Sequence, residues 1–140
     1  MDEKLKEISR FAGKADKPLN TYAPLTLAYI GDAVFELFIR TAVVEKAEER
    51  PKDMNRRTVA MVSAKAQSAM VEKIEPLLTE EEAAVYRRGR NANSATMAKN
   101  ASVADYRRAT GLEALIGYLY LKGDVERAAE LIRAAAFPEE

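Results

Sequence analysis

The chain of 140 residues contains no cysteine and no histidine. Without cysteine there can be no disulfide, no thiolate zinc site and no thiol nucleophile. Without histidine the chain lacks the most common general base and the most common ligand of transition metals. Carboxylates are therefore the expected catalytic groups, and Mg²⁺, with Mn²⁺ as its substitute, is the expected metal.

Long uncharged apolar runs and an excess of charge of one sign are also missing. No apolar run reaches the roughly 18 residues that a membrane-spanning helix needs without a charge. The N-terminal stretch MDEKLKEISR is too charged for a secretory signal, so we expect a cytoplasmic protein with no membrane partner. The 22 basic and 22 acidic residues cancel, and a hydrophobic content of 48% is typical of a globular protein. This length predicts one domain over residues 1–140.

The apolar residues recur with helical spacing, and the alternation typical of strands is missing, so the fold class is predicted to be all-α. Residues 89–102, rich in glycine, asparagine, serine and threonine, are expected to form a loop. The expected helices are residues 2–14, the apolar stretch after Pro24, a stretch opened by Pro51 and broken near Ser63, a helix begun by a Thr79–Glu82 capping box, and residues 102–122 and 124–136.

Two strongly apolar stretches each contain an acid that their composition does not explain. Asp32 lies in the middle of LTLAYIGDAVFELFIRTAVV, residues 25–44, and Glu113 is the only charged residue from 109 to 121. Helices this apolar are expected to be buried, and a buried carboxylate costs several kcal/mol unless it is paired, hydrogen-bonded or bound to metal. The small neighbours of the two acids would let the two helices approach closely: Gly31, Ala33, Ala114 and Gly117. A divalent cation could then hold both carboxylates.

A structural ion pair is the alternative explanation for these acids. Asp32, Glu36 and Arg40 follow one another at spacings of four, and Glu36 with Arg40 has the favourable orientation of a helical pair. Arg107 or Arg108 could also neutralise either acid. Spacing alone leaves metal ligation and ion pairing both open.

Basic residues are concentrated in one window of the chain. Between Tyr86 and Arg108 there are six basic residues and one acid, Asp105. Most charged residues of a globular protein simply face solvent, but a window this basic is also typical of a surface that contacts nucleic-acid phosphates.

Two motifs in this order resemble the ribonuclease III family. YIGDAVFEL is similar to its signature helix, and LEALIGYLYL is similar to its second acidic motif. The resemblance implies that Asp32 and Glu113 are catalytic residues and ligands of Mg²⁺ in the cleavage of double-stranded RNA. Two further acids of the family pattern are replaced here, by Ala28 and Thr110.

Other segments resemble the Mini-III branch of that family, which consists of the catalytic domain alone. These segments are RRGRNANSATMAKN and VSAKAQ. The resemblance implies a ribonuclease III-like homodimer with Tyr29 at the dimer interface, acting on precursor large-subunit ribosomal RNA. The RNA-binding residues that it implies are Lys65, Arg87, Arg88, Arg90, Asn91, Lys99 and Asn100.

Two other functions remain open from the sequence. A non-catalytic RNA-binding domain of the same fold would explain why only two of the family's acids are present. A helical DNA-binding or partner-binding protein would retain both acids for structural reasons and would show no preference for double-stranded RNA. Metal-dependent cleavage of double-stranded RNA distinguishes the predicted nuclease from both.

Overall fold

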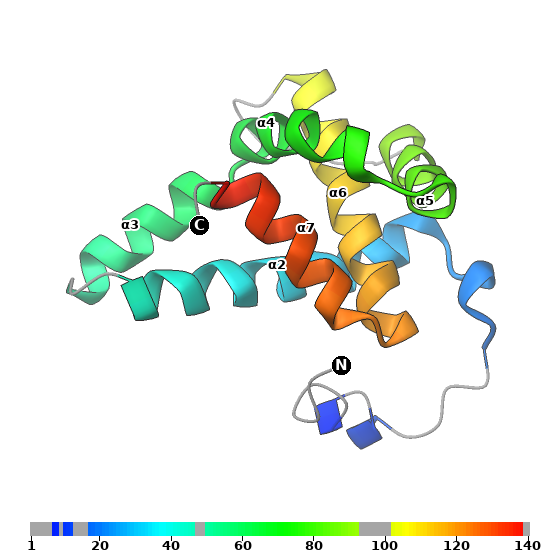
Figure 1. Cartoon of the computed structure of the whole chain (residues 1–140), viewed down its shortest axis with the longest axis horizontal. Helices are drawn as coiled ribbons and strands as arrows, with labels where there is room; N and C mark the ends of the chain where they lie inside the picture. Colours follow the sequence, from blue (N-terminus) through cyan, green and yellow to red (C-terminus); the bar gives the residue numbers. More distant parts are fainter. Residues whose placement is uncertain (1–6, 9, 13–16, 47–49, 93–101, 139–140) are drawn as a thin grey trace.

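The structure is a computed structural model that describes residues 7–8, 10–12, 17–46, 50–92 and 102–138. The described residues contain helices and no strand, which confirms the predicted all-α class (Figure 1). The elements are η1 (Leu19–Thr21), α2 (Pro24–Lys46), α3 (Pro51–Val62), α4 (Ala64–Ile74), η2 (Glu75–Leu77), α5 (Glu80–Asn91), α6 (Val103–Lys122) and α7 (Val125–Ala136).

Local sequence signals explain most of the helix boundaries. Ser63 separates α3 from α4, and its side chain accepts a hydrogen bond from the backbone N–H of Ala66. Thr79 and Glu82 form the predicted capping box at the start of α5. Gly123 ends α6 in the left-handed conformation, with φ of 91°, which glycine adopts without steric cost.

The central helix of the fold is α6, against which α2, α4, α5 and α7 all pack (Figure 1). Its side chains are buried nearly all round, as predicted from its composition. Fully buried α6 residues such as Leu112, Leu115 and Ile116 meet Phe35 and Ile39 of α2 in one hydrophobic core.

The prediction that the apolar helix after Pro24 is buried on all sides is wrong, because α2 is buried on one side only. Leu27, Phe35 and Ile39 face the core, whereas Asp32 is exposed and Tyr29 is 83% exposed. Because α2 is apolar on nearly every side, its sequence does not show which side packs against the rest of the fold. The sequence alone therefore suggested burial on all sides. Because Asp32 is exposed, its carboxylate does not have the desolvation cost that is expected of a buried acid.

The predicted helix at residues 2–14 lies partly outside the described residues. Residues 7–8 and 10–11 are helical, and both Ile8 and Phe11 are exposed. Each described helix is either too short or too polar to cross a lipid bilayer.

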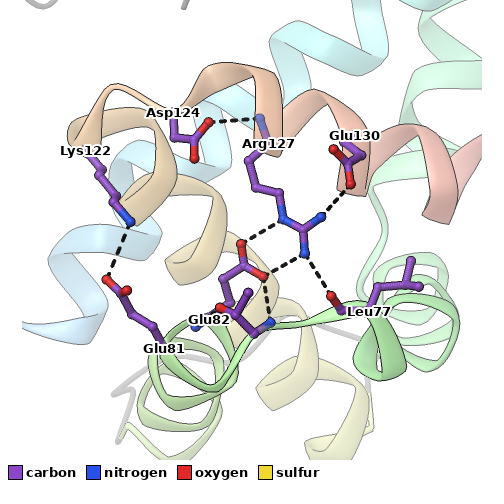
Figure 2. Close-up of polar contacts among 8 residues, drawn as sticks. Leu77, Glu81, Glu82, Lys122, Asp124, Arg127 and Glu130 are labelled. Carbon is purple, nitrogen blue, oxygen red and sulfur yellow. Dashed lines mark hydrogen bonds and ion pairs between the residues drawn. The ribbon is translucent and has the colours of Figure 1, made fainter.

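An ion pair that the sequence analysis did not predict joins α5 to α7 (Figure 2). The guanidinium of Arg127 donates to both carboxylate oxygens of Glu82, at 2.8 and 2.9 Å, and to the carbonyl oxygen of Leu77 at 2.8 Å. These contacts hold the pKa of Glu82 below its usual value, mainly because Arg127 donates to the ionised carboxylate.

Candidate active site

The candidate site lies where α2 crosses α6, and two glycines bring the helix backbones into contact. A Cβ atom added to Gly31 would lie 1.7 Å from the backbone oxygen of Glu113, and one added to Gly117 would lie 2.0 Å from the backbone oxygen of Leu27. No larger residue fits at either position without separating the helices. The prediction that small residues allow this approach is confirmed for Gly31 and Gly117, whereas Ala33 is exposed and Ala114 lies against Gly89 of α5.

This crossing brings the carboxyl groups of Asp32 and Glu113 together. Glu113 is half-buried, and its pKa is raised to about 8, first by desolvation and then by the negative charge of Asp32. A protonated Glu113 can also donate a hydrogen bond to Asp32, which raises the pKa further. The two acids thus face one another in a place where two negative charges repel strongly.

Of the ion pairs that the sequence offered as an alternative explanation for the acids, the structure shows the pair of Glu36 and Arg40. Arg40 lies 2.8 Å from Glu36, as predicted for a helical pair. Arg108 donates to the hydroxyl of Ser68 at 3.2 Å and lies 4.0 Å from Glu72, so its contacts are directed toward α4 rather than toward Glu113.

The chemistry of the two acids suits a hard divalent cation. Hard cations prefer carboxylate oxygens, and a cation between the acids would relieve the repulsion that now favours protonation of Glu113. Among the described residues, no group of three or more acids, histidines or cysteines forms a larger metal site. Thr110 is buried and donates its hydroxyl to the backbone oxygen of Tyr106, and its uncharged side chain does not supply the negative charge of the missing acid.

One polar residue of the site, Gln67 of α4, was not predicted from the sequence. Its side chain is 2% exposed, and its Nε2 donates to Oε2 of Glu113 at 3.4 Å. Gln67 is the last residue of the VSAKAQ segment, which resembles the Mini-III branch. The resemblance implied no role for this residue. Only the packing of α4 on α6 shows that its amide reaches Glu113.

The predicted RNA-binding residues that the structure describes lie at the surface. Arg87, Arg88 and Asn91 are exposed on the last turns of α5, and Lys65 is exposed near the start of α4. The Arg90 guanidinium lies over the ring of Tyr86, 5.6 Å from its centroid. Lys99 and Asn100 lie outside the described residues.

Comparisons with known proteins identify the family of this chain. The ribonuclease III domain family model matches residues 25–124, a range that includes Asp32 and Glu113. A Mini-ribonuclease 3 from Symbiobacterium thermophilum is 47% identical over 116 residues, covering 83% of this chain and 89% of the relative. A Mini-ribonuclease 3 from Clostridium tetani is 50% identical over 111 residues, covering 79% of this chain and 74% of the relative.

A solved structure has a similar fold. The crystal structure of a protein from Fusobacterium nucleatum superimposes with a TM-score of 0.77 at 34% identity, covering 83% of this chain and 94% of that one. With the helical fold, the paired acids and these relatives taken together, the chain belongs to the ribonuclease III family and is an endoribonuclease of that family.

Proposed function

We propose that this endoribonuclease hydrolyses phosphodiester bonds of double-stranded RNA with Mg²⁺ held by Asp32 and Glu113. The observation that carries the proposal is the convergence of these two carboxylates, in which the charge of one raises the pKa of the other. When bound, the cation would supply charge neutralisation at the phosphate and help to activate water. Mn²⁺ is its expected substitute.

The two acids contribute differently to such a site. Asp32 is exposed, so a phosphate of RNA can approach it, whereas Glu113 is half-buried and accepts a hydrogen bond from Gln67. With only two protein carboxylates, a cation would keep several waters and bind firmly when RNA phosphates supply further ligands. We therefore expect weak metal binding by the RNA-free protein.

We propose that the basic end of α5 binds the RNA backbone. Double-stranded RNA is recognised by shape and by contacts to phosphates and 2′-hydroxyls, and exposed arginines suit such contacts. The residues proposed for this role are Lys65, Arg87, Arg88, Arg90, Asn91, Lys99 and Asn100. Precursor large-subunit ribosomal RNA in the cytoplasm is the proposed physiological substrate, on the resemblance to the Mini-III branch.

We also propose a homodimer that pairs two copies of the 1–140 domain through the exposed side of α2. Tyr29 and Leu37 place large apolar groups in solvent on this helix, on either side of Asp32 along the chain, and exposed apolar patches mark interaction surfaces. Two copies would provide two acid pairs, which suits the cutting of both strands of a duplex.

Incubation of the purified protein with labelled double-stranded RNA, with Mg²⁺ or with chelator, tests the activity. We expect cleavage with Mg²⁺ only, and almost none from Asp32→Asn or Glu113→Gln. Glu36→Gln is the matched control, because it removes a carboxylate from the next turn of α2 and should cleave like the parent. Cleavage by Asp32→Asn at the parental rate would show that the proposed site is wrong.

A further inference from the structure

Gln67 is a buried polar residue that contacts a proposed metal ligand. Its Nε2 makes two hydrogen bonds, to Oε2 of Glu113 at 3.4 Å and to the backbone oxygen of Val62 at 2.9 Å. Val62 is the last residue of α3, where carbonyls lack partners within the helix. One amide group thus joins the end of α3 to the acid on α6.

The surroundings of this amide determine its orientation. Both neighbours of Nε2 are acceptors, and an amide nitrogen has two hydrogens to donate, so nitrogen and not oxygen must occupy this position. The orientation leaves Oε1 buried, with no hydrogen-bond partner among the described residues. A buried carbonyl without a partner destabilises the fold, and an apolar side chain of the same length would avoid that cost.

We infer that Gln67 is a positioning residue that holds the carboxylate of Glu113 in the orientation that binds the catalytic cation together with Asp32. The inference rests on the proposed metal site. The amide bonds only Oε2 of Glu113, so it limits rotation of the carboxylate without occupying both of its oxygens. Groups that hold metal ligands in this way typically change metal affinity or activity by about 10- to 100-fold when they are replaced.

Two substitutions of Gln67 test this role. Gln67→Met keeps the length and removes both donors, whereas Gln67→Asn keeps the amide but is one methylene too short to reach both acceptors. Ser68→Ala is the matched control, because Ser68 is the next residue of α4, is equally buried and contacts Arg108 rather than Glu113.

Titration of the RNA-free proteins with Mn²⁺, followed by the electron paramagnetic resonance signal of the free ion, measures metal binding without cleavage. We expect Gln67→Met and Gln67→Asn to bind Mn²⁺ about 10-fold more weakly or worse, and Ser68→Ala to bind like the parent. The Mg²⁺ concentration for half-maximal cleavage should rise in parallel, and excess Mg²⁺ should restore much of the rate. A loss of folded protein would lower the rate without moving that concentration.

Asp32→Asn, measured alongside, separates failure of this inference from failure of the proposed site. If Asp32→Asn loses Mn²⁺ binding and cleavage while both Gln67 variants keep the parental affinity and Mg²⁺ dependence, the role of Gln67 is refuted. If Asp32→Asn binds and cleaves like the parent, the metal site itself is refuted. Thermal melts in chelator show whether each Gln67 variant is folded, and the variant that folds decides the result.

Discussion

At the scale of single residues, Glu113 retains a proton more strongly than an ordinary glutamate does. Glu113 is half-buried beside Asp32, and its pKa of about 8 makes it mostly neutral at pH 7 in the metal-free protein. Proton and cation therefore compete for the same carboxylate. This competition couples metal binding, stability and pH through one residue.

We predict that the metal-free protein becomes less stable as pH rises from 4.5, the ordinary value for glutamate, to about 8. Over that interval the folded protein retains a proton on Glu113 that the unfolded chain releases, so the unfolding free energy falls, by about 1.4 kcal/mol for each unit of raised pKa. Denaturant unfolding in chelator across this range measures the effect.

Two variants identify the group responsible for this pH dependence. Glu113→Gln should remove the fall in stability, because its amide does not titrate, and Glu36→Gln should keep it. Added Mg²⁺ should stabilise the parent more at the alkaline end than at the acidic end. An unchanged pH dependence in Glu113→Gln would contradict the assignment.

At the scale of elements, α7 is attached to α5 by the ion pair of Arg127 and Glu82 (Figure 2). The carboxylate is buried and the guanidinium is mostly buried, and both make further hydrogen bonds. Without Glu82, the guanidinium of Arg127 would keep only the exposed carboxylate of Glu130 as a counter-charge, and a half-satisfied buried charge destabilises the packed helices.

We predict that Glu82→Gln lowers the unfolding free energy by roughly 3 kcal/mol at neutral pH, because Arg127 then lacks a buried counter-charge. The difference from the parent should shrink as pH falls below 4.5, since the pKa of Glu82 is depressed in the folded state and its stabilising contribution is lost on protonation. Thermal or denaturant melts measure both effects.

Glu81→Gln is the control for this experiment. Glu81 forms an ion pair with Lys122 at 3.6 Å, but both side chains are exposed, so its loss should cost less than about 1 kcal/mol. If Glu81→Gln and Glu82→Gln lowered the unfolding free energy equally, the burial of the Glu82–Arg127 pair would not explain its contribution to stability.

At the scale of the whole molecule, the proposed functions occupy different surfaces around the α2–α6 crossing. The exposed apolar residues of α2 lie on the helix that carries Asp32, and the exposed arginines lie at the end of α5, which packs against α6. This arrangement would let one surface bind a second copy while another binds RNA.

We predict that the parent is a dimer and that Tyr29→Glu is a monomer, because a charge in the middle of an apolar interface would be buried without a partner. Light scattering at micromolar concentration measures the oligomeric state. Leu77→Glu places the same charge on another exposed apolar side chain and should stay dimeric. A monomeric parent would contradict the proposal.

We predict that replacing Arg88, Arg90 and Lys99 together by alanine weakens binding of duplex RNA and reduces its salt dependence. Each lost phosphate contact removes about one unit from the slope of log affinity against log salt concentration. Titrations at several salt concentrations, with a cleavage-deficient Asp32→Asn background, measure this slope. Lys122→Ala, at the other end of α6, should bind like the background protein, and an unchanged slope in the triple variant would exclude these residues from the RNA contacts.

The sequence by itself determined the helical class, most helix boundaries and the two candidate acids. These features depend on neighbouring residues: the Thr79–Glu82 capping box acts within one turn, and Gly123 ends α6 through its own backbone conformation. The motifs around Asp32 and Glu113 are also contiguous, so their resemblance to the ribonuclease III family could be seen before the fold was known.

Only the tertiary structure decided which surfaces are covered and which distant residues meet. Helix α2 is apolar on nearly every side, so its periodicity could not show that Asp32 and Tyr29 face solvent. Arg127 and Glu82 are 45 residues apart, and Gln67 and Glu113 are 46 apart. Contacts at such separations depend on how whole helices pack against α6, and no local spacing in the chain encodes that packing.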